Sequence, residues 1–129
     1  MNQNKPKIII RKFTQKDIEK TSFLIKKVLN EINSKDYSLD VIQFMCDFYS
    51  SKKIIKKLST HKIYVTVEDN NILGTVSLKN NQISSLFVDP KFQGNGIGTK
   101  LMDYVELIAR KNGYNSTRKH DRQDKRSWS

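Results

Sequence analysis

The sequence predicts an α+β fold, a mostly antiparallel β-sheet with helices packed on it, in the order β-α-α-β-β-β-α. Three observations support this prediction. Several short runs rich in β-branched and aromatic residues alternate apolar with polar positions, which is typical of strands. Other segments repeat apolar residues at intervals of three and four, which indicates amphipathic helices. The stretch "QGNGIG" holds three of the five glycines, between the last strand run and the last helix.

The length of 129 residues permits one hydrophobic core and is too short for two. No stretch approaches the roughly 20 apolar residues of a membrane-spanning helix, and no signal peptide is recognisable, so we expect no membrane partner. The single cysteine, Cys46, excludes an internal disulfide and lies among apolar neighbours. It predicts a buried thiol in a cytoplasmic protein.

The formal net charge of +11 favours an anionic partner such as nucleic acid, a membrane or a phosphorylated ligand. However, the lysine pairs at 26–27, 52–53 and 56–57 lie at helical spacing, which is typical of a solvated helix face. Basic residues also do not alternate with aromatic ones, as binding of single-stranded nucleic acid requires. Charge alone therefore does not favour a nucleic-acid-binding function.

The run "KIIIRKF", residues 7–13, predicts the first strand. Thr14 then provides a helix N-cap, and Asp17 three residues later completes an arrangement close to a capping box. The following helix has lysines opposite one apolar stripe, formed by Ile18, Ile25, Val28, Leu29 and Ile32. Ser38 is the expected cap of a second helix, which either continues or restarts before residue 58.

Three further runs predict an antiparallel meander, namely "KIYVTVE" (62–68), "ILGTVSL" (72–78) and "QISSLFV" (82–88). Turn residues at 69–71 and 80–81 connect these strands as hairpins. The last helix begins at Ile97 and runs for about four turns. Gly113 is placed to end it.

Gly94, Gly96 and Gly98 surround the start of this last helix. Glycines in such a turn are required by positive φ angles or leave clearance for a ligand. The first N–H groups of a helix lack intrahelical partners and favour anions, and Thr99 and Lys100 add a hydroxyl and a cation. We interpret the loop as a pyrophosphate cradle, with a tight strand-to-helix turn as the alternative. It lacks both the ending of a Walker loop and the parallel setting of a dinucleotide loop.

Residues 83–114, "ISSLFVDPKFQGNGIGTKLMDYVELIARKNGY", closely resemble the central acetyl-coenzyme A motif of the GNAT superfamily of N-acetyltransferases. The shared features are a strand ending in apolar-x-Val-x-Pro, a glycine loop introduced by Gln93, and an amphipathic helix. The resemblance covers residues 7–114. It implies a GNAT-like sheet with helices on both faces, and direct attack by an acceptor amine on acetyl-CoA.

By this resemblance, backbone N–H groups of residues 94–98 hold the pyrophosphate of coenzyme A. The last strand pairs with the pantetheine arm, and a bulge there directs an N–H group at the thioester carbonyl. The cofactor-binding residues so implied are Leu86, Phe87, Val88, Gln93, Gly94, Asn95, Gly96, Ile97, Gly98, Thr99 and Lys100. The acceptor is a small-molecule or peptide amine, and no metal ligand is assigned.

No catalytic residue is assigned from the sequence. Glu68 and Asp69 are the acids nearest the predicted sheet, but a strand end entering a turn explains both. Gln82 cannot act as a base, and His61 is interpreted as a strand-entry residue. His120 and Trp128 are interpreted as tail residues without a role.

Residues 115–129 depart from the family pattern, which continues with a strand, a helix that often carries a proton-donating tyrosine, and a hairpin. This segment has a single apolar side chain and an excess of arginine. We therefore expect an acetyl-CoA-binding domain at 1–114 and a basic polar tail at 115–129, disordered or non-native. A native tail, a frameshift and vector-derived sequence remain alternatives.

Two main function hypotheses follow, an N-acetyltransferase and a catalytically impaired fragment that at most binds acyl-CoA. A basic nucleic-acid-binding domain is a third. Without a further strand, residues 82–88 would form a free sheet edge, so we expect a homodimer or a loosely ordered C-terminal third, together with weak turnover. Gly96→Glu is expected to abolish coenzyme A binding with little loss of fold, because a surface loop absorbs the side chain.

Overall fold

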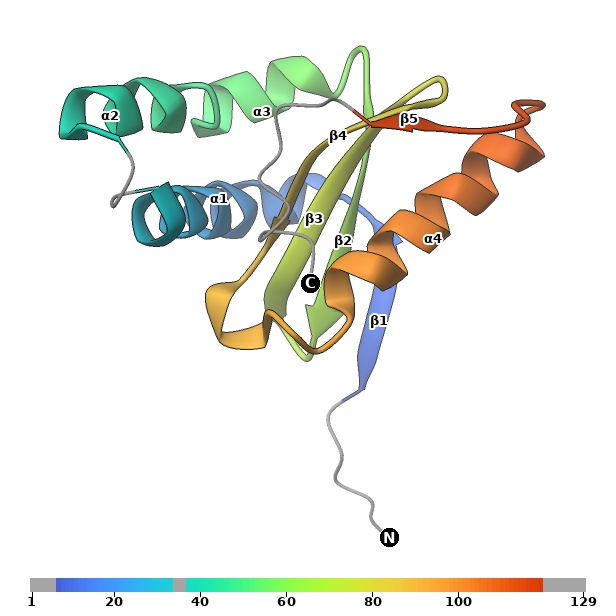
Figure 1. Ribbon diagram of the computed structural model, residues 1–129, viewed down its shortest axis with the longest axis horizontal. Helices are drawn as coiled ribbons and strands as arrows, with labels where there is room; N and C mark the ends of the chain where they lie inside the picture. The colour runs from blue at the N-terminus through green and yellow to red at the C-terminus, as the bar shows by residue number, and fades with distance from the viewer. Residues whose placement is uncertain (1–6, 34–36, 120–129) are drawn as a thin grey trace, which may run out of the picture.

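The chain forms a five-stranded sheet with helices on both faces (Figure 1). The computed structural model describes residues 7–33 and 37–119. Its elements are β1 (Ile8–Lys12), a 3-10 turn η1 (Gln15–Asp17), α1 (Ile18–Asn33), α2 (Leu39–Asp47), α3 (Ser51–Lys57), β2 (Lys62–Glu68), β3 (Asn71–Lys79), β4 (Gln82–Val88), a 3-10 turn η2 (Pro90–Phe92), α4 (Ile97–Lys111) and β5 (Arg118–Lys119). The predicted α+β fold is confirmed. No helix of this described part is long and apolar enough to cross a membrane.

The strands lie in the order β1-β2-β3-β4-β5, and each of the first four is antiparallel to its neighbours among them. Turns of two residues connect β2 to β3 and β3 to β4; the second was predicted at 80–81, whereas the first is one residue shorter than the predicted 69–71, because Asn71 already belongs to β3. The first residue of each turn, Asp69 or Asn80, has a left-handed φ of 56° or 57°. Asp and Asn tolerate this conformation better than other non-glycine residues, which explains the composition of these turns.

Both faces of the sheet are buried. On one face, α1, α2 and α3 pack against a cluster that includes Ile63, Val65 and Val67 of β2. On the other face, α4 packs against a cluster that includes Tyr64 of β2 and Val76 of β3. Successive side chains of a strand point to opposite faces of the sheet. In the central strands, consecutive residues are therefore buried alike, some under α4 and the others under α1, α2 and α3. The helices on both faces that the family resemblance implied are therefore present.

Gly74 in β3 allows α4 to approach the sheet closely. A Cβ atom at this position would lie 3.0 Å from Leu101 Cδ1 and 3.1 Å from Ile97 Cγ2. These distances are too short for a side chain without displacement of α4. Because Ile97 is the first residue of α4, this contact fixes where the helix N-terminus meets the sheet.

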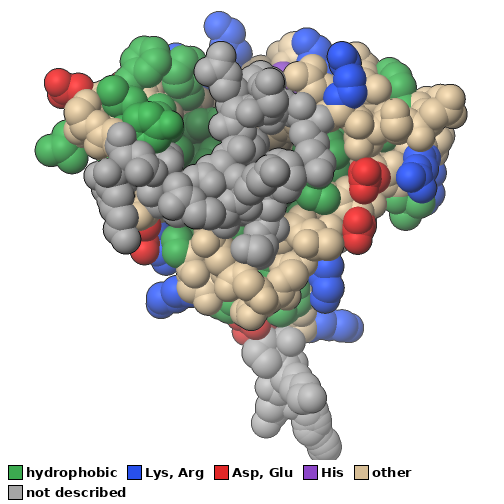
Figure 2. Space-filling view, in the orientation of Figure 1, with side chains coloured by type: hydrophobic (Ala, Val, Ile, Leu, Met, Phe, Trp, Pro, Cys, Tyr) green, Lys and Arg blue, Asp and Glu red, His purple; other side chains and the backbone are tan. Residues whose placement is uncertain are grey.

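The second helical segment restarts after Asp47 and does not continue. α2 follows Ser38, whose Oγ accepts from the Val41 N–H at 3.4 Å, and α3 follows Ser50, whose Oγ accepts from Lys53 N–H at the same distance. The predicted cap at Ser38 is thus confirmed, and Cys46 of α2 is free and buried as expected. Apolar side chains nevertheless gather on the surface over α2, at the upper left of Figure 2. The exposed ones in α2 and just after it are Leu39, Val41, Phe44 and Phe48.

The strand β5, Arg118–Lys119, lies in the segment for which the sequence predicts a disordered or non-native tail. It pairs in parallel with the first two residues of β4, and Arg118 N–H donates to the Asn81 carbonyl at 2.7 Å. Strand pairing uses backbone groups, so a segment of polar side chains can still form it. The expected free edge of β4 is therefore covered at its start.

An ion pair between a buried carboxylate and a partly exposed guanidinium joins β1 to the beginning of α1. The Asp17 carboxylate accepts from the Thr14 backbone N–H at 2.7 Å and from its hydroxyl at 3.2 Å. Arg11 donates to both Asp17 oxygens, at 2.8 and 2.9 Å. The predicted role of Thr14 and Asp17 at this helix start is confirmed. The guanidinium of Arg11 lowers the pKa of Asp17 below its ordinary value.

Replacing Asp17 by Asn should lower the free energy of unfolding by about 2 kcal/mol at neutral pH, because charged hydrogen bonds to Arg11 and Thr14 are lost. A lowered pKa in the folded state means that this stabilisation is complete above the ordinary Asp pKa of about 3.9 and is lost as the pH falls through the folded-state value. Urea unfolding at about pH 7 and about pH 3 measures the effect.

The difference between the wild type and Asp17→Asn should therefore shrink at the lower pH. Asp103→Asn is the matched control, because Asp103 is exposed on α4. It should change the free energy of unfolding by less than about 0.5 kcal/mol. An Asp17→Asn effect of the same size at both pH values would contradict the role given to the Asp17 charge.

Candidate active site

The glycine turn lies between β4 and α4, at the bottom of Figure 1. Gly94 has a φ of 90° and Gly96 a φ of 82°, so the backbone itself requires glycine at both positions. No atom lies within 4 Å of a Cβ built at either residue, so the turn is also open. Gly98 lies in the first turn of α4 and is buried. The turn is thus tight and accessible at the same time.

The start of α4 presents a row of unpaired backbone donors. Among the described residues, the N–H groups of Gly96, Ile97, Gly98 and Thr99 have no hydrogen-bond acceptor, and Lys100 is the first to bond back, to the Gly96 carbonyl. These groups lie at the positive end of the helix dipole, and the first turn contains no acidic residue. Thr99 and Lys100 are exposed beside them. The arrangement can bind an anion.

Two polar side chains hold the glycine turn against the end of β4. Gln93 Nε2 donates to the Val88 carbonyl at 3.3 Å. The Asp89 carboxylate accepts from the Lys91 backbone N–H at 3.0 Å and from Lys27 Nζ of α1 at 3.2 Å. The ion pair with Lys27 was not predicted from the sequence. The only local signal is an Asp directly before a Pro, which is typical of a capped turn.

The second half of β4 has one free edge. β3 pairs with it on one side, whereas β5 reaches only the first two residues on the other. The outward backbone groups of Leu86–Val88 therefore face no strand within the described residues. The side chains of these three residues are buried, which holds this part of the strand in place.

A β-bulge interrupts β4 at Ser85. Thr75 is opposite Phe87 and Ser77 is opposite Ser84, so two residues of β4 span the space of one residue in β3. Ser85 has a left-handed φ of 53°, which is strained for a serine. A bulge is thus present where the family resemblance implied one.

Lys57 and Tyr49 contact the bulge from the helical side. Lys57 Nζ donates to Ser85 Oγ at 2.7 Å, and the Tyr49 hydroxyl lies 3.2 Å from the same oxygen. Burial lowers the pKa of Lys57 and raises the pKa of Tyr49. The sequence analysis missed this cluster, because its members come from α3, β4 and the turn between α2 and α3. The lysine pair that contains Lys57 indicated only a solvated helix face.

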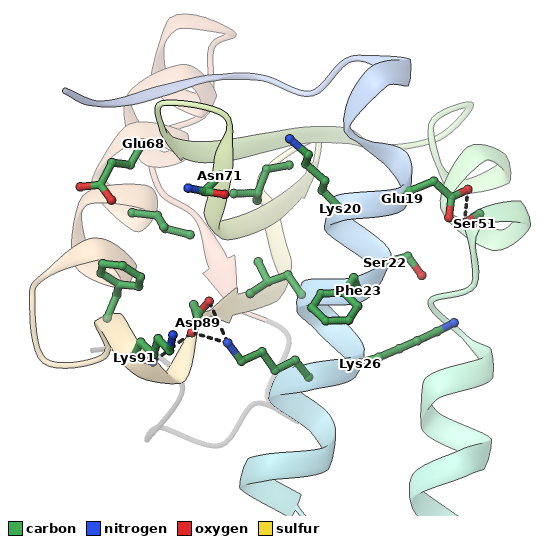
Figure 3. Close-up of a pocket in the computed structure, with 15 residues that line it drawn as sticks. Glu19, Lys20, Ser22, Phe23, Lys26, Ser51, Glu68, Asn71, Asp89 and Lys91 are labelled. Atoms are coloured by element: carbon green, nitrogen blue, oxygen red, sulfur yellow. Dashed lines mark hydrogen bonds and ion pairs between the residues drawn. The ribbon is translucent and has the colours of Figure 1, made fainter. Parts of the chain in front are cut away.

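A pocket of about 770 Å³ lies between α1, the β2–β3 turn and η2 (Figure 3). Its charged lining consists of Glu19, Lys20, Lys26, Lys27, Glu68, Asp89 and Lys91. The pocket shares η2 with the approach to the glycine turn, but residues 93–100 do not line it. The structure therefore places the predicted cofactor residues in two groups, the β4 edge and the α4 start, beside this pocket and outside its lining.

The acidic and histidine residues that the sequence analysis considered lie outside the glycine turn and the bulge, where the structure describes them. Glu68 lines the pocket, and Asp69 lies in the β2–β3 turn. His61 Nδ1 hydrogen-bonds with the Thr60 hydroxyl at 2.7 Å. His120 and Trp128 lie outside the described residues. Within residues 7–33 and 37–119, no group of three His, Cys, Asp or Glu side chains could hold a metal ion.

Comparison with known proteins places this geometry in a family. A family model described as an acetyltransferase (GNAT) domain matches residues 33–123, which is more than half of the chain. The chain belongs to the GNAT acetyltransferases. It is therefore an acyltransferase. The match runs past residue 114 and does not decide the domain boundary expected there. No curated protein matches the sequence.

Solved GNAT structures share the fold. The PaiA N-acetyltransferase from Thermoplasma acidophilum, solved with coenzyme A, has a TM-score of 0.74 and 23% identity, over 83% of this chain and 74% of its own. A GCN5-related N-acetyltransferase from Rhodopseudomonas palustris has the same score and identity, over 88% and 71%. A protein from Clostridium acetobutylicum, described as a predicted acetyltransferase and solved with acetyl-CoA, has a TM-score of 0.67 and 18% identity, over 94% and 84%. At sequence identities of 18–23%, these similarities show a shared fold and nothing further.

Replacing Asp89 by Ala should loosen the glycine turn of this GNAT domain. The substitution removes the cap on the Lys91 N–H and the partner of Lys27, and should lower the free energy of unfolding by about 1–2 kcal/mol. Hydrogen exchange of the amides in 93–98 should become faster than in the wild type. Lys27→Met is the control, because it removes the ion pair and keeps the cap, and its effect should be smaller. Unchanged exchange in Asp89→Ala would show that Asp89 does not hold the turn.

Proposed function

We propose that this GNAT chain transfers an acetyl group from acetyl-CoA to the nitrogen of a small-molecule or peptide amine. One observation carries the proposal, namely the four unpaired N–H groups at the open glycine turn before α4. The family assignment supports it, since acetyl-CoA supplies the activated acetyl thioester of the reaction. The amine attacks the thioester carbonyl directly.

The glycine turn suits a diphosphate in geometry and in charge. Of the N–H groups of 94–98, those of Gly96, Ile97 and Gly98 are unpaired and would donate to the pyrophosphate oxygens, with Thr99 and Lys100 beside them, whereas the Asn95 N–H donates to the Phe92 carbonyl at 3.3 Å. Gln93 and Asn95 flank the turn, and Gln93 fixes its start on β4. The net charge of +11 attracts a polyanionic cosubstrate over longer distances, which explains the charge without a nucleic-acid partner.

The free edge of β4 suits the pantetheine arm. Amide groups of the arm would pair with the backbone of Leu86, Phe87 and Val88, as an added strand would. The bulge at Ser85 turns the backbone at the upper end of this edge. A backbone N–H there would donate to the thioester carbonyl and stabilise the negative charge that develops on its oxygen.

Comparison of Gly96→Glu with Gly96→Ala tests the proposed cradle. Both residues must adopt a φ near 82°, so both variants should lose about 1–2 kcal/mol of stability. This corrects the expectation that Gly96→Glu leaves the fold almost unaffected. Only Glu places a negative charge and a longer side chain where the pyrophosphate would bind. Calorimetry with coenzyme A should show a loss of affinity of about 100-fold or more for Gly96→Glu, and at most a few-fold for Gly96→Ala.

The same experiment separates the two function hypotheses. Excess acetyl-CoA should raise the melting temperature of the wild type. At a concentration of 100 times the dissociation constant, the ligand should increase the free energy of unfolding by about 2.7 kcal/mol. A thiol-release assay with small amines then distinguishes an acetyltransferase from a chain that only binds acyl-CoA. Equal coenzyme A affinity in the wild type and Gly96→Glu would reject the cradle.

We also propose a homodimer through the free edge of β4 and a cytoplasmic location. β5 covers only the start of that edge, so unpaired backbone groups remain for a second chain. Light scattering should give the mass of two chains, and addition of acetyl-CoA should shift the mass toward one, because the pantetheine would take the same edge. A monomer at all concentrations would contradict the dimer and leave the acetyl-CoA site unaffected.

A further inference from the structure

Lys57 of α3, Ser85 of β4 and Tyr49 in the turn between α2 and α3 form a hydrogen-bonded cluster at the β4 bulge. Lys57 Nζ and the Tyr49 hydroxyl lie 2.7 and 3.2 Å from the same Ser85 oxygen. The ammonium also lies over the Tyr49 ring, 5.7 Å from its centroid. Ser85 is only 7% exposed, whereas Lys57 and Tyr49 are half-buried. The cluster therefore connects the interior of the bulge with the solvent.

The partners of Lys57 are unusual for a structural lysine. A buried ammonium normally pairs with a carboxylate, because desolvation of an unpaired charge is costly. In residues 7–33 and 37–119, Lys57 forms no ion pair with any carboxylate. Its partner is a hydroxyl on a residue with a left-handed φ of 53°. Strained backbone of this kind concentrates at functional sites.

The titratable groups around Lys57 are cationic or neutral. His61 follows α3, and burial together with the positive charges of Lys57 and Lys79 lowers its pKa. Tyr49 has a pKa raised by burial, so its phenol stays protonated. Burial lowers the pKa of Lys57 as well. These surroundings make the ammonium form of Lys57 less stable than that of an exposed lysine.

We propose that Lys57 is a catalytic base that takes the proton of the acceptor ammonium, with Ser85 and Tyr49 positioning its amine beside the bulge. This inference rests on the proposed function, which places the thioester at the same bulge. One acceptor proton passes to Lys57, and the freed nitrogen bonds to the acetyl carbon as the carbon–sulfur bond breaks. The second nitrogen proton passes to the leaving thiolate, and Lys57 returns its proton to solvent.

The protonation of Lys57 can be measured without any acceptor. In protein carrying carbon-13 lysine, the Cε signal of Lys57 is assigned by its absence from the spectrum of Lys57→Arg. Its titration midpoint should lie below the value of about 10.4 that exposed lysines show. Addition of acetyl-CoA should shift this signal, because the thioester would bind next to it. A midpoint equal to that of the exposed lysines would overturn the proposal.

Kinetics then separate a base from a structural or cationic role. Lys57→Arg keeps a charged donor to Ser85 but cannot accept a proton near neutral pH. It should lower kcat about 100-fold or more, as loss of a general base does, and move the acidic limb of the kcat profile to higher pH. Lys56→Met is the control, since Lys56 is exposed one residue earlier in α3, and it should retain wild-type kcat. The acceptors are spermidine, tyramine and a peptide with a free N-terminus.

Calorimetry with coenzyme A distinguishes this proposal from the proposed function. Lys57→Arg should bind coenzyme A within about threefold of the wild type, because the cradle lies beyond the end of β4 and Lys57 contacts Ser85 in the middle of the strand. A wild type that does not bind coenzyme A would reject the proposed function, whereas the lysine titration would still report on Lys57. Lys57→Arg with wild-type kcat and an unchanged pH profile would overturn the role of Lys57 as a base.

Discussion

The β-bulge at Ser85 determines which way the later residues of β4 face. Side chains alternate between the faces of a strand, so residues three apart normally lie on opposite faces. Ile83 and Leu86 are three apart, yet both are buried in the cluster under α4. The extra residue in the bulge makes this arrangement possible. It also turns Ser85 toward Lys57 and Tyr49 on the opposite face.

The position of the glycine turn follows from that bulge. Beyond it, Leu86 and Val88 pack under α4, while the Phe87 ring packs against the Tyr49 ring at 5.2 Å. These contacts hold the end of β4 from both faces, and Gly74 brings the first turn of α4 against the neighbouring strand. The unpaired N–H groups are therefore fixed by packing beneath them.

The sequence predicted those parts of the fold that depend on local rules. The strands at 62–68 and 82–88 were predicted because short turns rich in Asp or Asn join β-rich runs, and the helix start at Asp17 because its partners are neighbours in sequence. The bulge was suggested only by the family resemblance. In retrospect, Ile83, Leu86 and Val88 cannot all face one side of a regular strand, so the pattern of "QISSLFV" itself contained the signal. β5 could not be predicted from side chains, because backbone pairing alone forms it.

Lys57 illustrates why the candidate site was only half predictable. A glycine turn can be recognised in the sequence, because positive φ angles at closely spaced positions favour glycine there. A lysine near a helix end carries no such mark, and only the tertiary contact with Ser85 distinguishes Lys57 from the exposed lysines of α3. The contact also shows how positive charges near Lys57 would act on the reacting groups. A bound ammonium near Lys79 would be repelled in its charged form, and once Lys57 has accepted the acceptor proton its new positive charge would attract the departing thiolate. A neutral Lys57 is therefore needed to start the exchange, and the proton that it gains supplies the positive charge that favours the anionic leaving group.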